Sequence, residues 1–455
     1  MNIKSFLVFF LTISFSLVLD AQVTQNQTID NFLEKEYAGN NPGAVILIAQ
    51  NNQIIFKNAY GLSDVKKRKT IKTDMIFQVG SMTKQFTSTA VLQLVEQGKV
   101  SLDDPIQKYV KYFPNKEYPV TIHHLLSQTS GIPEFFDIDE DEMYLLSQEH
   151  TPEQLISYFK DLPLAFEPGS EFQYSNSNYP LLGVVIEEVS GMSLKEYLKV
   201  NLFEPLKMHS TSLWYADKTK KKRIANGYRS YQGELISSPK IVGSVPYAAG
   251  AIVSTAEDLL LWNRELKNRT FLSDFIVESL ITEKQTYSGT GTGYGYGFFI
   301  KELVGYKTIQ HGGNLYGFTS SGLYLPDEDL FVCILSNKSL ERTEKVANYL
   351  ASEVLGTPLE IEDKSQLVYG EFEEYFGTYQ LKGDSKLIEI FMLDDVLLLD
   401  FPEARGTGTI LTVIDKDKME SKAVNALIQF TRDKKGQIIG FTADQNGITE
   451  WEKIK

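Results

Sequence analysis

The segment Val79-Gly-Ser-Met-Thr-Lys-Gln-Phe86 sets both the fold of this chain and the position of its chemistry. Apolar residues recur at helical spacing from its end onward, at Phe86, Ala90, Val91, Leu94 and Val95. The pattern predicts a mostly buried helix over residues 81–97. Because Gly80 lets the chain turn sharply before it, Ser81 opens this helix and Lys84 lies one turn further on the same face.

The pairing of Ser81 with Lys84 is chemically suggestive because a serine hydroxyl attacks poorly unless a nearby base takes its proton, and a neutral amine can do so. Burial can lower a lysine pKa from about 10.4 toward 7. The start of a helix favours an alkoxide, and the Ser81 amide can face a developing oxyanion. The Ser-x-x-Lys spacing occurs four times, at Ser63/Lys66, Ser81/Lys84, Ser157/Lys160 and Ser237/Lys240. Of these, only Ser81/Lys84 combines a helix start with burial.

Two further motifs supply complementary groups. Tyr174-Ser-Asn176 follows a turn, and a phenol can relay a proton to a leaving group, while the Asn176 amide can bind a substrate carbonyl and the lysine side of the site. His311-Gly-Gly-Asn314 ends a predicted strand, and its paired glycines, Gly313 included, let a backbone come close to a ligand. An extended substrate can bond to this edge, with the Asn314 amide as a second oxyanion donor. Alone, each motif is also typical of a plain loop or strand end.

Six stretches have the apolar patterning of strands, and a tight turn at Asn51-Asn52 joins the first two: residues 43–49, 54–56, 296–301, 307–311, 322–325 and 330–336. A helix is predicted at 343–354. Between about 120 and 270 the signals are helical, with three apparent capping boxes at Thr151/Gln154, Ser193/Glu196 and Ser254/Glu257. The layout is therefore sheet, helical insert, sheet and helix.

The C-terminal part has a different pattern. After a polar segment at 358–366, seven short alternating stretches separated by turns predict a small antiparallel β-barrel, assigned as a second domain at 366–455: residues 378–381, 387–391, 396–401, 409–414, 426–430, 438–442 and 448–451. The predicted organisation is a signal peptide at 1–21, a main domain at 22–360 and this β domain.

Composition narrows the functional classes. The 455 residues are 42% hydrophobic and 23% charged, which is typical of a soluble globular protein. The net charge of −14 disfavours nucleic acid as a partner. A single cysteine excludes an intramolecular disulfide and a thiolate cluster, and five histidines without His-Glu-x-x-His give no zinc motif, so we expect no metal and no cofactor. The absence of Gly-x-Ser-x-Gly disfavours an α/β-hydrolase.

The N-terminus has the features of a secretory signal: Lys4, an apolar run over 6–19 and a cleavage region at Asp20-Ala-Gln22. The run is shorter than the roughly 20 residues that a membrane-spanning helix needs, which makes a membrane anchor the less favoured interpretation. We expect the signal to be removed and the mature protein to be periplasmic or secreted, without membrane association.

The order Ser-x-x-Lys, Tyr-x-Asn, His-x-Gly resembles the serine beta-lactamase and penicillin-binding-protein superfamily, in particular its class C-like branch with D-aminopeptidases, DD-peptidases and esterases. The likeness covers roughly residues 30–355 and includes Thr121-Ile-His-His-Leu-Leu126, Thr129-Ser-Gly-Ile-Pro133, Phe166-Glu-Pro-Gly169, Ala249-Gly-Ala-Ile-Val-Ser-Thr-Ala256 and Gly293-Tyr-Gly-Tyr-Gly297. It implies an α+β fold, with a five-stranded antiparallel sheet beside a helical subdomain and the site between them. The tail resembles the lipocalin-like domain of some members.

By this resemblance Ser81 is the acylated nucleophile, Lys84 and Tyr174 share base and acid duties, and Asn176 and His311 position the substrate. The ionisations of Lys84 and Tyr174 are then coupled, and either group is a candidate for the first proton acceptor.

The chain departs from the beta-lactamase pattern at His311-Gly-Gly, where that branch typically carries Lys-Thr-Gly. A histidine is largely neutral at pH 7 and Gly312 has no hydroxyl, so both offer less to a substrate carboxylate. We therefore expect a peptidase, amidase or esterase acting on a small molecule or peptide, with beta-lactamase or DD-carboxypeptidase activity ranked below. A binding or sensor protein of the same fold that acylates without turnover is the non-enzyme alternative.

Overall fold

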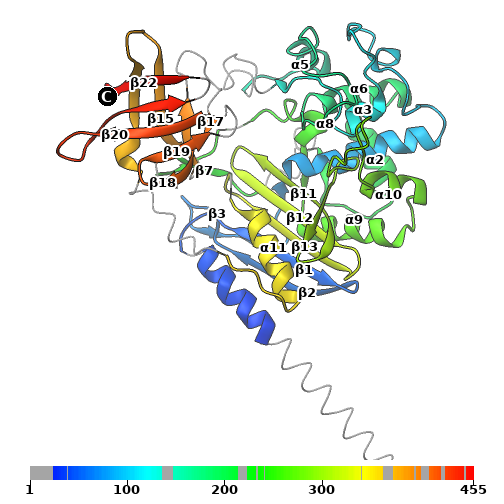
Figure 1. Ribbon diagram of the computed structural model, residues 1–455. Helices are drawn as coiled ribbons and strands as arrows, with labels where there is room; N and C mark the ends of the chain where they lie inside the picture. The colour runs from blue at the N-terminus through cyan, green and yellow to red at the C-terminus, as the bar shows by residue number, and fades with distance from the viewer. Residues whose placement is uncertain are drawn as a thin grey trace, which may run out of the picture.

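The computed structural model describes residues 24–37, 39–135, 147–213, 223–231, 234–239, 241–339, 341–361, 372–393, 396–400, 409–421, 426–444 and 447–455 (Figure 1). The signal predicted at 1–21 and the predicted start of the second domain at 366 lie outside these residues.

A six-stranded antiparallel sheet lies at the centre of the main domain, in the order β10-β11-β12-β13-β1-β2. Its strands are β1 (Ala44–Gln50), β2 (Gln53–Tyr60), β10 (Phe299–Leu303), β11 (Tyr306–Leu315), β12 (Phe318–Leu325) and β13 (Leu330–Ser336). All six predicted stretches join it, so the five strands implied by the resemblance are one too few. β2 lies at one edge of the sheet, where the Asn51-Asn52 turn folds it back along β1, with φ of 50° and 64° as a tight hairpin requires.

The glycines of the His-x-Gly motif lie inside a strand, not at its end as predicted. β11 runs on to Leu315, because Gly312 and Gly313 pair with Ser321 and Ser320 of β12. The ladder to β12 thus holds the backbone of this motif extended along the sheet.

Both faces of the sheet are covered, which explains the continuous apolar runs of its central strands. Along β1, Val45 and Leu47 enter one core, and Ile46 and Ile48 enter the other. The second core lies under the helix at 24–36 and α11 (Thr343–Val354), which lie on one side of the sheet (Figure 1). α11 matches its predicted bounds.

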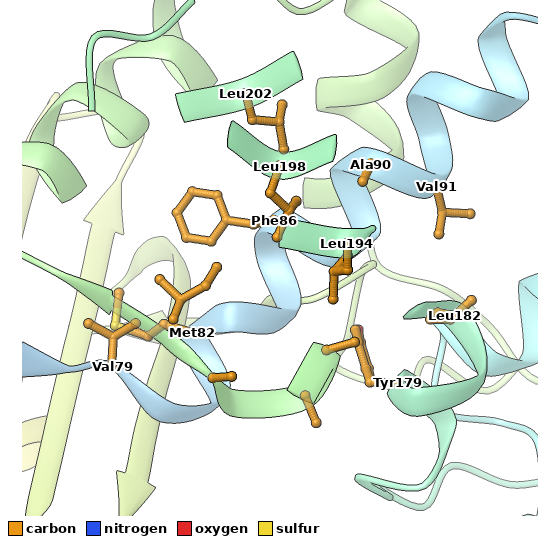
Figure 2. Packing of buried hydrophobic residues seen from close by; sticks show 14 of the residues in the cluster. Val79, Met82, Phe86, Ala90, Val91, Tyr179, Leu182, Leu194, Leu198 and Leu202 are labelled. Atoms are coloured by element: carbon orange, nitrogen blue, oxygen red, sulfur yellow. The ribbon is translucent and has the colours of Figure 1, made fainter. Parts of the chain in front are cut away.

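The helical region covers the opposite face. Its helices are α2 (Thr83–Glu96), α3 (Ile122–Leu126), α5 (Pro152–Ser157), α6 (Asn178–Ser190), α7 (Leu194–Leu198), α8 (Tyr247–Gly250), α9 (Ala256–Asn268) and α10 (Asp274–Ile281). α2 is buried over most of its length and packs against α6, α8 and α10. Figure 2 shows Phe86 and Ala90 of α2 beside Leu194, Leu198 and Leu202.

The helix caps follow the predicted pattern with one correction. Thr151 and Gln154 form the predicted capping box, and Ser193 accepts the Glu196 amide. The third cap is one residue later than predicted: Thr255 caps α9 by accepting the Asp258 amide at 3.2 Å. The hydroxyl of Ser254 instead bonds to a threonine hydroxyl inside the core.

Short strands complete the main domain. β3 (Leu62–Asp64) pairs with β4 (Lys69–Thr70), and β5 (Phe77–Gln78), β9 (Ile252–Ser254) and β6 (Ser212–Leu213) form a small sheet in the order β5-β9-β6. β5 leads directly into the Val79–Phe86 segment, so this small sheet fixes where that segment begins.

The C-terminal residues form an antiparallel β structure as predicted, with more strands than the pattern indicated. They are β14 (Gly377–Leu381), β15 (Leu387–Leu393), β16 (Val396–Asp400), β17 (Thr409–Ile410), β18 (Thr412–Asp415), β19 (Lys418–Ser421), β20 (Ala426–Arg432), β21 (Ile438–Asp444) and β22 (Ile448–Lys453). The stretch predicted at 409–414 divides at Leu411 into β17 and β18, which stand at opposite ends of the strand order.

The C-terminal sheet encloses a hydrophobic core of its own, built around Tyr379, Phe430 and Phe441. It is also joined to the main domain: a hairpin of β7 (Tyr228–Tyr231) and β8 (Glu234–Ser237) pairs with β15. The two parts therefore share one hydrogen-bonded sheet of eleven strands in the described residues.

Candidate active site

Ser81 lies in a short 3-10 turn, Gly80–Met82, rather than in the first turn of the predicted helix, because α2 begins at Thr83. The turn follows Val79, whose amide donates to the Ile252 carbonyl of the small sheet at 3.1 Å. Gly80 has a φ of +52°, and a Cβ there would lie 3.0 Å from the Asn314 nitrogen. The turn can thus present Ser81 toward β11 only with glycine before it.

Lys84 is fully buried directly behind Ser81. Its Nζ donates to Ser81 Oγ at 3.1 Å, to Asn176 Oδ1 at 2.7 Å and to the Ala249 carbonyl at 3.0 Å. Two aromatic rings enclose it, with Nζ 4.9 Å from the ring centroid of Tyr174 and 5.1 Å from that of Tyr179. The structure thus brings the predicted serine, lysine, tyrosine and asparagine together.

The electrostatic environment of Lys84 favours the neutral amine. Burial lowers its pKa from 10.5 to about 7, and the carboxylate of Glu134 acts in the opposite direction. Desolvation therefore causes the shift, since a charged amine loses its hydration in this enclosed position. Near neutral pH a substantial fraction of Lys84 can accept a proton.

Tyr174 contributes a phenol that stays protonated. Burial raises its pKa well above the ordinary value, and the nearby Ser81 hydroxyl offsets part of that rise. Its ring stacks on Phe299 at 6.0 Å. The hydroxyl is buried, and beyond the nearby Ser81 hydroxyl it has no hydrogen-bond partner among the described residues. A buried donor of this kind is costly unless a ligand completes its bonding.

The loop that carries Tyr174 is held by the segment that follows α3. The side-chain oxygen of Gln128 accepts the Ser175 amide at 3.0 Å, and its carbonyl accepts the Gln173 amide at 3.0 Å. Thr129-Ser-Gly-Ile-Pro133 and Phe166-Glu-Pro-Gly169 are hydrogen-bonded to each other through their backbones, since the Thr129 carbonyl accepts the Gly169 amide. These two stretches, recognised in the sequence, are thus supports for the catalytic loop.

Asn176 makes the predicted contact with the lysine, but through its oxygen. Oδ1 accepts from Lys84, which leaves the side-chain NH₂ as the group that can meet a substrate. Its backbone amide donates to Glu134 Oε2 at 2.6 Å. Glu134 therefore belongs to the site, although nothing in the sequence pattern indicated it.

The other wall of the site is β11. A cavity of about 480 Å³ opens between Ser81 and this strand. Among its lining residues are Ser81, Tyr174, His311, Gly313 and Asn314. A Cβ on Gly313 would lie 2.0 Å from the Val79 carbonyl, so the strand backbone is in direct contact with the turn that carries Ser81.

His311 lines the cavity, but both of its ring nitrogens face protein groups. Nδ1 lies 2.5 Å from the Gly312 carbonyl, and Nε2 lies 3.4 Å from the Tyr294 hydroxyl. Burial lowers its pKa to about 3, and the charge of Lys84 acts in the same direction. The imidazole is therefore neutral, donating from Nδ1 and accepting at Nε2.

Tyr294 and Ala249 join the site from motifs whose roles the sequence left open. Tyr294, from Gly293-Tyr-Gly-Tyr-Gly297, is fully buried and packs its edge against Phe299 at 4.9 Å. Gly297 of the same motif lies against α2, where a Cβ would come within 3.0 Å of the Lys84–Gln85 backbone.

The described residues contain no group of three or more His, Cys, Asp or Glu that could hold a metal ion. In the same residues, no helix is long and apolar enough to cross a bilayer.

Comparison with known proteins agrees with this geometry. The family model described as Beta-lactamase matches residues 26–356. The chain belongs to the beta-lactamase family. Protein flp of Staphylococcus aureus (strain N315) is 29% identical over 352 residues, which cover 74% of this chain and 68% of that protein. The resemblance inferred from the three ordered motifs is thus confirmed, and the protein is a serine hydrolase of the acyl-enzyme type.

Solved structures extend the similarity. The octameric penicillin-binding protein homologue from Pyrococcus abyssi has a TM-score of 0.66 and 26% identity, over 94% of this chain and 99% of that one. The D-amino acid amidase from Ochrobactrum anthropi has a TM-score of 0.64 and 22% identity, over 73% of this chain and 99% of that one, a likeness of fold. Because it covers 94% of this chain, the first match includes most of the C-terminal part.

Proposed function

We propose that this protein is a secreted or periplasmic serine hydrolase that acylates Ser81 with a small-molecule or peptide substrate and cleaves an amide or ester bond. One observation carries the proposal: a fully buried amine, Lys84 Nζ, lies 3.1 Å from Ser81 Oγ, with its pKa lowered to about 7. This is the combination that a general base needs, namely reach to the proton and a pKa near the working pH.

The proposed reaction has two steps. Ser81 Oγ attacks the substrate carbonyl carbon and passes its proton to Lys84, giving a tetrahedral oxyanion. That intermediate collapses as the bond to the leaving group breaks, and the leaving nitrogen or oxygen takes a proton through the Tyr174 phenol, which Lys84 re-protonates. A water molecule then attacks the acyl-Ser81 ester, Lys84 takes its proton, and the acid product leaves as Ser81 recovers its hydrogen.

The assignment of Lys84 rather than Tyr174 as first acceptor follows from the opposite directions of their pKa shifts. Burial favours the neutral form of both, which makes the amine a base and the phenol an acid. In this proposal the oxyanion lies between the backbone amides of Ser81 and Asn314, and the packing of Gly80 against Asn314 supports this position.

The β11 residues that line the cavity are uncharged, and Lys301 and Arg342, which also line it, are paired with Glu344 and Glu36. This arrangement favours substrates without a carboxylate beside the scissile bond. His311 carries no charge and turns both nitrogens to protein groups, and Gly312 has no side chain. An amidase or esterase role therefore ranks first. Beta-lactamase or DD-carboxypeptidase activity ranks second, although one similar structure is described as a penicillin-binding protein homologue. Location outside the cytoplasm rests on the apolar segment at 6–19 and its flanks.

Intact-mass spectrometry with a fluorophosphonate tests the proposal. The wild-type protein should gain one adduct and the Ser81→Ala variant none. Ser157→Ala is the matched control, because Ser157 has the same spacing to a lysine but is exposed on α5, and this variant should label normally. Adduct formation on Ser81→Ala would overturn the assignment. With p-nitrophenyl esters, return to the starting mass indicates an enzyme, whereas a lasting adduct indicates a sensor.

A further inference from the structure

Two adjacent residues, Pro133 and Glu134, bind the loop that carries Tyr174 and Asn176. Glu134 Oε2 accepts the Asn176 amide at 2.6 Å, and the neighbouring Pro133 carbonyl accepts the Ser177 hydroxyl at 2.6 Å. Two successive residues of one segment thus fix two successive residues of the other. The two contacts together hold Asn176 next to Glu134.

Asn176 transmits this contact to the nucleophile. The chain of hydrogen bonds runs from Glu134 to the Asn176 backbone (2.6 Å), from the Asn176 side chain to Lys84 (2.7 Å) and from Lys84 to Ser81 (3.1 Å). A carboxylate that lies outside the reaction cavity is therefore linked to the reactive hydroxyl through two intervening residues.

The charges around Lys84 make this carboxylate distinctive. In the described part of the chain, the groups that face the amine are the phenols of Tyr174 and Tyr179, the imidazole of His311 and, from α8, the Ala249 carbonyl. At neutral pH these are all uncharged. Among the described residues, Glu134 is the ionised group that acts on the lysine, and its sign favours the protonated amine.

We propose that Glu134 is a positioning residue of this site, which holds Asn176 against Lys84 and places a negative charge two hydrogen bonds away from the amine. The inference rests on the proposed function of Lys84 as the base. The charge prevents burial from making the amine too weak a base, since a base whose pKa lies far below the working pH accepts a proton poorly.

Glu134→Gln separates the two roles, because glutamine keeps an acceptor for the Asn176 amide and loses the charge. The pH profile of kcat/KM with p-nitrophenyl acetate should keep its shape, while its acidic limb shifts to lower pH by about one unit. At pH 5.5, kcat/KM of the variant, as a fraction of its own plateau, should then be roughly eightfold larger than the corresponding fraction for the wild type. The plateau itself should fall about threefold, because the base is weaker.

Two controls make the result specific. Glu171→Gln removes an exposed carboxylate from the same loop and should leave the acidic limb in place. Glu134→Asp keeps the charge with a shorter reach, so its limb should stay near that of the wild type while kcat falls. If Glu134→Gln folds poorly, the aspartate variant still tests positioning, because an unchanged kcat there would contradict it.

The outcomes distinguish this inference from the proposed function. An acidic limb that does not move in Glu134→Gln overturns the role of the Glu134 charge, even if Ser81 remains the nucleophile. A purely structural role would lower kcat without moving the limb, and that result also overturns it. By contrast, hydrolysis that survives in Ser81→Ala would remove the proposed function itself.

Discussion

Gly313 lies directly against Val79, so closely that a Cβ on the glycine would be 2.0 Å from the Val79 carbonyl oxygen. This contact joins the strand that forms one wall of the site to the residue that precedes the Gly80–Met82 turn. It explains why a glycine occupies this position of β11, where φ is not in the left-handed region: the requirement is for space.

Gly313→Ala should therefore separate the strand from the nucleophile. A displacement of about 1 Å at this contact predicts a loss of roughly 100-fold in kcat/KM. Gly312→Ala is the matched comparison, because its Cβ would meet the Ser320 carbonyl at 3.1 Å, a tight contact that a small shift relieves. Equal activity losses in the two variants would show that the contact with Val79 does not matter.

Tyr174→Phe should separate activity from stability. Beyond the nearby Ser81 hydroxyl, the buried phenol hydroxyl has no partner among the described residues, so its removal should leave the melting temperature unchanged or higher. The rate should nevertheless fall by about 10²–10³, as expected when a proton relay is lost. Thermal melts and ester hydrolysis measured on the same preparation check both parts, and a destabilised variant with full activity would contradict the assigned role.

Lys84 should also make stability depend on pH. Its pKa is about 7 in the folded protein and 10.5 ordinarily, so between these values the unfolded chain binds more protons. The free energy of unfolding should then rise with pH, by up to about 2 kcal/mol between pH 7.5 and 9. Urea unfolding of Lys84→Met should lack this part of the rise. The same pH dependence in both proteins would mean that Lys84 is not deprotonated in the folded state.

The neutral histidine predicts poor use of carboxylate-bearing beta-lactams. Nitrocefin turnover by the wild type should be weak or absent, because His311 has no charge and its nitrogens face Gly312 and Tyr294. His311→Lys should raise nitrocefin turnover relative to turnover of p-nitrophenyl acetate, since a cation would then face the substrate carboxylate. Wild-type turnover at ordinary lactamase rates would reverse the ranking of substrates.

The sequence revealed the groups whose chemistry depends on local spacing. Ser81 and Lys84 lie one turn apart, and Tyr174 and Asn176 lie on one short loop, so a motif was enough to select them. Apolar patterning likewise located the six strands of the central sheet and α11. For β1 and β13 the signal was an uninterrupted apolar run, because these strands are buried on both faces.

What the sequence did not reveal depends on contacts between distant segments. Glu134 is one of 59 acidic residues and is selected only by its bond to Asn176, 42 positions away. Ala249 acts through a backbone carbonyl, which no residue type marks. The end of β11 was misplaced because its glycines suggested a break, whereas pairing with β12 supports an extended backbone there.

The central claim is that a neutral Lys84 activates Ser81, and the pH dependence of Ser81 phosphonylation by a fluorophosphonate tests it most directly. The rate constant, followed by intact mass, should rise with pH and level off with a midpoint near 7, where the pKa of Lys84 lies. The Lys84→Met variant should be phosphonylated much more slowly, and its rate constant should show no midpoint near pH 7. A wild-type rate that keeps rising beyond pH 9, as for an unassisted hydroxyl, would contradict the account.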